Sequence, residues 1–268
     1  MFLSICCAAS LLGSGALFQA QGQIIPLVDG NSSALVDTGS QAGMFNWTVE
    51  GVNQLFQQWF WFRIGPAGPE AAINTISAPA ILTPGPNMLT TTYANAALNI
   101  RVDYTLTGGA PGSGNAHINE SITINNTSGA ALDFHFFQYS DYDLNGAPGG
   151  DTAQLKKNAL GLFNEADQSK GPVVFTENDV TPGANHGEIS FYPLTLNSLN
   201  DGAPTTLSDT VGPLGPGDVT WALEWDQLIP NGQSMLISKL KDVTVPEPSA
   251  LTLVCLGLAG FLCQRRRR

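Results

Sequence analysis

Apolar and polar residues alternate along the middle of the chain, and this pattern predicts β-strands. In segment 98–107 the apolar residues occupy every second position, with polar residues between them. Segment 117–125 repeats the two-residue period, which is typical of a strand with one buried face. The intervening residues 108–114 include four glycines and one proline. We therefore expect the two strands to form an antiparallel hairpin with a long turn.

Further short segments rich in β-branched and aromatic residues are bounded by Gly, Pro or Asn. They comprise residues 44–51, 55–64, 88–93, 132–142, 160–164, 173–177, 189–196, 219–228 and 234–241. Many short strands separated by turns favour an all-β fold, here an antiparallel β-sandwich that is either jelly-roll-like or a larger two-sheet sandwich. Helices are expected to be minor, and segment 151–160 is the best helical candidate.

The first residues of the chain predict a secretory signal. An apolar stretch runs from Phe2 to Phe18, and Ala20-Gln21-Gly22 then supplies the small residues that a signal peptidase requires. We expect residues 1–22 to form a signal peptide, although no basic residue precedes the apolar stretch. A buried N-terminal helix is the alternative. Residues 23–244 would then form the exported β-sandwich domain.

The last residues of the chain predict a membrane anchor. The sequence Val245-Pro246-Glu247-Pro248-Ser249 precedes an apolar run over residues 250–263, and Arg265, Arg266, Arg267 and Arg268 follow it. A helix of that run spans about 21 Å, less than the roughly 30 Å of a hydrocarbon core. Flanking residues and snorkelling arginines would complete the span. The arginine cluster places the preceding residues outside the cytoplasm by the positive-inside rule.

These three parts, in this order, resemble the PEP-CTERM sorting signal. The resemblance covers residues 245–268 and comprises the Pro-Glu-Pro box, the short transmembrane helix and the arginine cluster. It implies export in a Gram-negative bacterium and anchoring in the inner membrane through the C-terminal helix. It also implies recognition by an exosortase, a membrane processing enzyme, and a final location at the cell surface or in an exopolysaccharide matrix. The resemblance concerns delivery and not chemistry.

Charge and cysteine content narrow the possible functions. The chain carries 11 basic and 22 acidic residues, a net charge of −11. Nucleic acid is therefore not an expected partner, because phosphate backbones are bound by basic surfaces. The four cysteines, Cys6, Cys7, Cys255 and Cys263, all lie in the two terminal segments. Residues 23–244 consequently contain no disulfide, no Cys-ligated zinc and no Cys nucleophile.

One acidic motif indicates a possible metal site. The sequence Asp141-Tyr142-Asp143-Leu144-Asn145-Gly146 matches the first half of a calcium-binding loop. Thr152 stands where an EF-hand has glutamate, and the preceding residues predict a strand, so an EF-hand is not expected. A Ca²⁺ site formed by Asp141, Asp143, Asn145 and Asp151 in a strand-to-loop turn remains open. The alternative is a turn in which the carboxylates accept backbone N–H groups.

Two tryptophans offer a possible sugar-binding surface. Trp59 and Trp61 share one side of segment 55–64, and the other side is also aromatic. If exposed, the two indoles could stack on sugar rings. The favoured interpretation is that this strand lies centrally in a thick core with both sides covered. Trp221 and Trp225 on segment 219–228 are expected to be core residues in the same way.

The sequence contains no recognised catalytic motif, and we expect a protein without a catalytic centre. Acidic residues in or near predicted strands are the candidates for a hydrolytic pair: Glu120, Asp133, Asp141, Asp143, Glu224 and Asp226. Glu120 shares the apolar side of its strand, which an edge position or a partner such as Arg63 or Arg101 would explain. The histidines, His117, His135 and His186, are dispersed along the chain.

These observations favour a non-enzymatic protein of the cell surface or exopolysaccharide matrix. A carbohydrate-binding module is the first alternative. A glycan hydrolase or lyase is the second.

Overall fold

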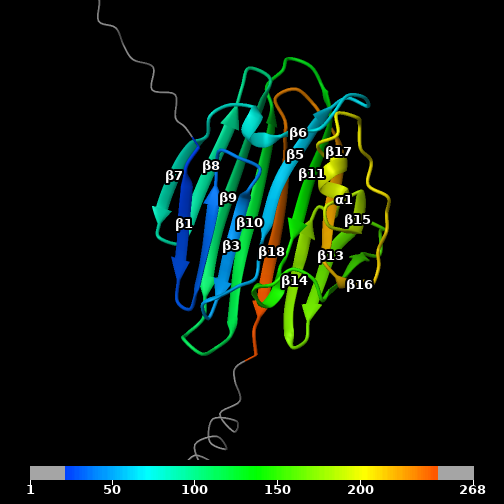
Figure 1. Ribbon diagram of the computed structural model, residues 1–268. Helices are drawn as coiled ribbons and strands as arrows, with labels where there is room; N and C mark the ends of the chain where they lie inside the picture. Colours follow the sequence, from blue (N-terminus) through cyan, green and yellow to red (C-terminus); the bar gives the residue numbers. More distant parts are fainter. Residues whose placement is uncertain (1–21, 247–268) are drawn as a thin grey trace, which may run out of the picture.

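A computed structural model describes residues 22–246 and contains two β-sheets packed face to face (Figure 1). Strand accounts for 60% of the structure and helix for 5%, which confirms the all-β prediction. Each sheet has nine strands, so the larger two-sheet sandwich is the form adopted. The predicted signal peptide and the predicted C-terminal helix, residues 250–263, lie outside the described residues. Between residues 22 and 246, no helix has the length and apolar character needed to cross a membrane.

The first sheet has the spatial order β1-β2-β3-β5-β11-β17-β15, and β4 and β6 pair with β3 and β5. Its strands are β1 (Ile24–Asp29), β2 (Ser32–Asp37), β3 (Gly43–Val49), β4 (Val52–Asn53), β5 (Gln57–Ile64), β6 (Ala71–Ala72), β11 (Leu132–Asp141), β15 (His186–Phe191) and β17 (Val219–Ile229). All neighbouring strands in this sheet are antiparallel except β3 and β5, which run parallel over a short contact at Gly43 and Met44.

The second sheet is entirely antiparallel and has the order β16-β12-β13-β14-β18-β10-β9-β8-β7. Its strands are β7 (Ala80–Gly85), β8 (Met88–Ala94), β9 (Leu98–Gly108), β10 (Asn115–Asn126), β12 (Asp151–Lys157), β13 (Phe163–Lys170), β14 (Val173–Thr181), β16 (Leu214–Gly217) and β18 (Ser234–Thr244). The described helices are short: η1 (Ile73–Thr75), η2 (Leu144–Gly146) and α1 (Leu194–Ser198). Helix α1 lies against β15 and β17 at one side of the sandwich (Figure 1).

The predicted hairpin is present as β9 and β10, which pair in antiparallel register from Leu98↔Asn126 to Gly108↔Ala116. Every second residue of both strands is buried, as the apolar period requires. Segment 151–160, the best helical candidate, is not helical: its first seven residues form strand β12. Asp151, Ala153 and Leu155 point inward at alternate positions there. Packing between two neighbouring strands outweighs the helix preference of these residues.

A buried ionic cluster lies between the sheets. Glu120 on β10 points inward, as its place among isoleucines predicted, but its partners are Lys239 and Lys241 of β18 and not an arginine. The two lysine Nζ atoms lie 2.7 Å and 3.0 Å from Glu120 Oε1. Glu177 of β14 lies 3.2 Å from Lys241 and completes two pairs of opposite charge. Lys239 also lies over the rings of Phe60 and Trp225 from the first sheet.

Candidate functional site

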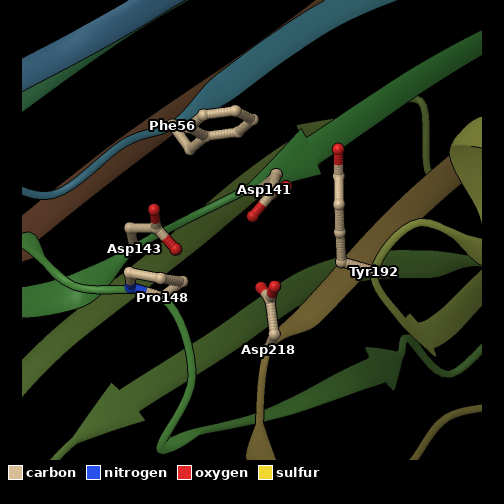
Figure 2. A pocket seen from close by; sticks show the side chains of 6 residues that line it. All are labelled: Phe56, Asp141, Asp143, Pro148, Tyr192 and Asp218. Atoms are coloured by element: carbon tan, nitrogen blue, oxygen red, sulfur yellow. The ribbon is translucent and has the colours of Figure 1, made fainter.

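A pocket of about 250 Å³ lies at the end of the first sheet where β5 and β17 begin and β11 and β15 end. Its lining residues are Phe56, Asp141, Asp143, Pro148, Tyr192 and Asp218. In an antiparallel sheet the start of one strand lies beside the end of its neighbour. Pairing of Asp141 with Thr220 and with Gln57 therefore brings distant chain segments together at this edge (Figure 2).

Three carboxylates converge inside this pocket. Asp141, Asp143 and Asp218 each offer an oxygen, and these oxygens all lie within 4.8 Å of one another. Figure 2 shows the three side chains pointing toward one common space. Asp141 is only 1% exposed, whereas Asp143 and Asp218 are partly exposed at the mouth of the pocket. The three carboxylates therefore surround a space that is large enough for a small cation, and they concentrate negative charge around it.

Few donors compensate the buried carboxylates. Tyr139 donates its hydroxyl to Asp141 Oδ2 at 3.4 Å, and Asp141 Oδ1 has no hydrogen-bond partner within residues 22–246. Asp151, at the start of β12, is 1% exposed, and neither of its carboxylate oxygens has a hydrogen-bond partner in the same part of the chain. Lys170 Nζ lies 3.7 Å from Asp151 Oδ2. Buried carboxylates without donors are costly, which distinguishes this site from an ordinary acidic surface.

Burial and mutual repulsion raise the pKa values of these carboxylates. Burial, together with the charges of Asp143 and Asp218, raises the pKa of Asp141 to about 8. Burial also raises the pKa of Asp151 to about 7, a shift that the charge of Lys170 opposes. The pKa of Asp143 is raised by burial and by Asp218. Two carboxylates with raised pKa values in the pocket, Asp141 and Asp143, and a third beside it, Asp151, mark it as a candidate binding site.

Two exposed aromatic rings form the rim of the pocket. Phe56 is 51% exposed and Tyr192 is 42% exposed. Their ring centroids lie 6.3 Å apart with an interplanar angle of 84°. A concave surface that combines aromatic faces with a few convergent polar groups is typical of a small-ligand site.

The structure revises the residues of the predicted metal site. Asp141 and Asp143 meet in the pocket, and Asp151 lies close enough for its charge to affect Asp141. Asn145 is an exposed residue of η2 and does not line the pocket. Asp218 takes part instead, a residue that sequence reasoning missed because it lies far away along the chain. Only the pairing of β11 with β17 brings it near, so no local motif could have revealed it. Metal binding itself stays a prediction.

The predicted sugar-stacking surface at Trp59 and Trp61 is not present. The side chains are 1% and 0% exposed. The Trp59 indole N–H donates to Asn74 Oδ1 at 3.1 Å, and that of Trp61 donates to Asn200 Oδ1 at 3.4 Å. Trp61 also packs edge-on against Tyr139. Because covering segments occupy the ring faces, the core interpretation of this strand is correct.

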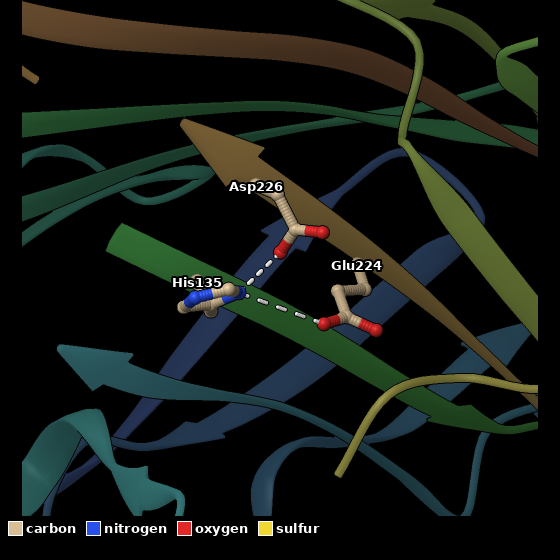
Figure 3. Close-up of side chains that lie close together, drawn as sticks. All are labelled: His135, Glu224 and Asp226. Atoms are coloured by element: carbon tan, nitrogen blue, oxygen red, sulfur yellow. Dashed lines mark hydrogen bonds and ion pairs between the residues drawn. The ribbon is translucent and has the colours of Figure 1, made fainter. Parts of the chain in front are cut away.

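A second cluster joins His135 of β11 to Glu224 and Asp226 of β17 (Figure 3). His135 Nδ1 contacts Asp226 Oδ1 and lies 3.8 Å from Glu224 Oε1. His186 Nε2 lies 3.6 Å from the other oxygen of Asp226. Burial, together with the charge of Asp226, raises the pKa of Glu224 to about 8. Two of the three histidines that are dispersed in the sequence, His135 and His186, therefore share the carboxylate of Asp226.

The segment that follows α1, which includes Thr205 and Leu207, covers this second cluster. Leu207 donates its backbone N–H to Glu224 Oε2 at 2.8 Å, and Glu224 is fully buried. Arg63 pairs with Glu70 and donates to the carbonyl of Thr205 at 2.6 Å. These contacts give the cluster a role in holding the covering segment. Of the remaining carboxylate candidates, Asp133 lies exposed beside His135 and Glu120 lies in the buried ionic cluster.

Residues 244–268 match the PEP-CTERM protein-sorting motif, as the tail predicted. The motif implies export by way of a membrane-anchored precursor and recognition by an exosortase. No curated protein matches the chain.

Several solved structures share the fold at very low sequence identity. A bacterial glucoamylase complexed with acarbose has a TM-score of 0.59 and 10% identity over 87% of this chain. This chain spans 33% of that enzyme's length. A galactose mutarotase related enzyme from Lactobacillus acidophilus has a TM-score of 0.55 and 7% identity, over 84% of this chain and 99% of its own. A putative aldose 1-epimerase from Escherichia coli K12 has a TM-score of 0.53 and 9% identity, with the same coverage. These likenesses concern the fold alone.

Proposed function

We propose that this chain is an exported, non-enzymatic protein of the bacterial cell surface or exopolysaccharide matrix. It is delivered as a precursor anchored in the inner membrane and is processed by an exosortase-type enzyme. The observation that carries the proposal is the match of residues 244–268 to the PEP-CTERM protein-sorting motif. The sorting segment follows the sandwich without a linker, since β18 ends at Thr244. The N–H of Val245, the first residue of the Pro-Glu-Pro box, donates to the carbonyl of Gly114 at 2.7 Å.

A carbohydrate-binding role of the sandwich is the second part of the proposal. It rests on the pocket beneath Phe56 and Tyr192, where exposed rings stand next to several carboxylate acceptors. Sugar rings present apolar C–H faces and hydroxyl donors, which complement these two kinds of surface. The structural neighbours, which include a glucoamylase complexed with acarbose and a putative aldose 1-epimerase, agree with a carbohydrate ligand. A surface protein with such a pocket would retain matrix polysaccharide.

Cell fractionation tests the delivery part. The full chain and a variant truncated after Val245 are expressed in a host that contains an exosortase. We expect the full chain in the envelope and matrix fractions and the truncated chain in the soluble periplasm. Identical distribution of the two chains would overturn this part of the proposal.

Co-sedimentation with purified matrix polysaccharide tests the binding part. We expect Phe56→Ala and Tyr192→Ala each to weaken retention about five-fold or more, because each removes an aromatic contact worth about 1 kcal/mol or more. Leu82→Ala is the matched control, since Leu82 is an exposed apolar residue of the second sheet. Equal retention of all variants would exclude this pocket. An increase in reducing ends during incubation would show hydrolysis and overturn the non-enzymatic assignment.

A further inference from the structure

The geometry of the pocket carries a more specific inference: we infer that Asp141, Asp143 and Asp218 bind one divalent cation of the calcium class. Their oxygens lie within 4.8 Å of one another. Calcium binds oxygen ligands at about 2.4 Å, so two ligands on opposite sides of the ion stand about 4.8 Å apart. An ion near the centre of the cluster is therefore close to all three carboxylates, and small side-chain rotations bring their oxygens to the ligand distance of calcium.

The state of Asp141 separates this pocket from an ordinary acidic surface. The side chain is 1% exposed, it lines the pocket, and its Oδ1 atom has no hydrogen-bond partner in the described part of the chain. A buried carboxylate oxygen without a donor is strongly unfavourable unless a bound group compensates it. Figure 2 shows this carboxylate directed toward Asp143 and Asp218, where a cation would lie.

The charge around the site favours a divalent ion. Asp151 adds a fourth carboxylate, itself buried, near the cluster, and Lys170 Nζ lies 3.7 Å from Asp151 Oδ2. Four acidic groups and one lysine leave a formal charge of −3 when all are ionised. A divalent cation neutralises most of this charge, which water or a backbone N–H cannot do.

The kind of ligand selects the class of metal. The converging groups are carboxylates, with neither imidazole nor thiolate among them, and hard oxygen ligands suit calcium or magnesium rather than zinc or copper. Magnesium requires near-octahedral geometry at about 2.0–2.1 Å and keeps most of its water ligands, so it binds less readily to three fixed carboxylates. The ligands come from a strand end, a turn and the start of another strand. Calcium tolerates such an irregular arrangement.

The ion would retain open coordination positions toward the rim. Calcium takes six to eight oxygen ligands, and three carboxylates supply three to six of them. The remaining positions face the mouth of the pocket between Phe56 and Tyr192, where water or vicinal hydroxyl groups can bind. This last step, in which a saccharide hydroxyl replaces water on the ion, rests on the proposed function. The cation site itself does not.

Calorimetric titration of calcium chloride into the full-length, chelator-stripped chain in detergent tests the inference without any glycan. We expect one ion per chain with a Kd on the order of 10⁻⁴ M, typical of extracellular calcium modules. Asp143→Asn and Asp218→Asn should weaken binding about ten-fold or more, because each removes a charged ligand. Asp103→Asn, on β9 of the second sheet, is the matched control and should bind as the parent does. Magnesium should bind more weakly than calcium.

Thermal unfolding provides a second readout that detects misfolded variants. Millimolar calcium should raise the midpoint of the parent chain, since an ion that binds only the native state stabilises it. Asp141→Asn should unfold cooperatively and show no calcium response. Absence of both heat and a thermal shift in the parent at 10 mM calcium would overturn the site, as would undiminished binding in both Asp143→Asn and Asp218→Asn. Calcium binding without polysaccharide retention would support the cation site and overturn only the glycan role.

Discussion

The Nζ atom of Lys241 lies 3.0 Å from Oε1 of Glu120, and both side chains are fully buried between the two sheets. Lys239 shares the same glutamate, and Glu177 is the second acidic partner of Lys241. Burial opposes ionisation of Glu120, but the two lysines outweigh it and lower its pKa. The buried positive and negative charges therefore cancel only while both glutamates and both lysines are present.

We expect Glu120→Gln to reduce the free energy of unfolding by about 3–5 kcal/mol, because it leaves two buried lysines facing one glutamate. Urea unfolding followed by circular dichroism measures the change. Lys156→Ala is the control: its pairs with Glu165 and Asp167 are solvent-accessible, and such pairs contribute about 0–1 kcal/mol. Equal effects of the two substitutions would contradict this view of the cluster.

The short parallel contact between β3 and β5 depends on a glycine. Gly43 has a φ of +56°, and a Cβ atom there would lie 2.2 Å from the carbonyl oxygen of Gln58 and 2.4 Å from Trp59 Cε3. We expect Gly43→Ala to destabilise the fold by about 2 kcal/mol or more, since both backbone strain and a clash with a neighbouring strand arise.

Gly51→Ala is the matched control for Gly43→Ala. Gly51 has a φ of +77°, but a Cβ atom there meets nothing within 4 Å. Only the conformational strain remains, which costs about 1 kcal/mol. Thermal or urea unfolding of both variants separates the clash at the β3–β5 contact from the strain. A larger loss in Gly51→Ala than in Gly43→Ala would show that the contact is not tight.

Local alternation of side chains made much of the fold predictable. β9, β10 and β17 lie within two residues of their predicted ends. In β9 and β10 every second residue is buried, as the apolar period predicts, whereas the first seven residues of β17 are all buried. β15 was predicted to continue to Leu196, but it ends at Phe191 and α1 follows. The strands that were not predicted are β1, β2, β4, β6, β7, β12 and β16.

The candidate site was only half predictable for a related reason. Asp141 and Asp143 stand two residues apart in a motif that matches half of a calcium-binding loop, so the local sequence indicated that both could bind one ion. Asp218 and Tyr192 reach the pocket through antiparallel pairing of β11 with β17 and of β17 with β15. Such register is a property of the assembled sheet, and no local pattern in the sequence specifies it.

Burial of the tryptophans gives a spectroscopic prediction. Trp47, Trp59, Trp61, Trp221 and Trp225 are each at most 1% exposed. We expect native tryptophan emission to be blue-shifted relative to the unfolded chain and to be quenched several-fold less by acrylamide. Binding of polysaccharide should leave this quenching unchanged, because the proposed pocket is lined by Phe56 and Tyr192 and contains no tryptophan. Protection of tryptophan by polysaccharide would contradict binding at this pocket.

The last prediction concerns Glu224 and pH. Burial, with the nearby charge of Asp226, raises the pKa of Glu224 from 4.5 to about 8 in the folded protein. The native state therefore binds more protons than the unfolded state between these two values. Protonation of Glu224 therefore stabilises the folded protein at acidic pH. This stabilisation is lost as the pH rises from about 4.5 to 8.

Glu224→Gln tests this sign because glutamine keeps an oxygen for the N–H of Leu207 but cannot ionise. Relative to the variant, the parent should lose stability on the order of a few kcal/mol between pH 5 and pH 8, since each pKa unit corresponds to about 1.4 kcal/mol. Urea midpoints of both chains across this range measure the difference, and other titrating groups cancel in the comparison. A parent that gains stability relative to the variant as the pH rises would mean that Arg63, 4.0 Å away, outweighs burial and keeps Glu224 ionised.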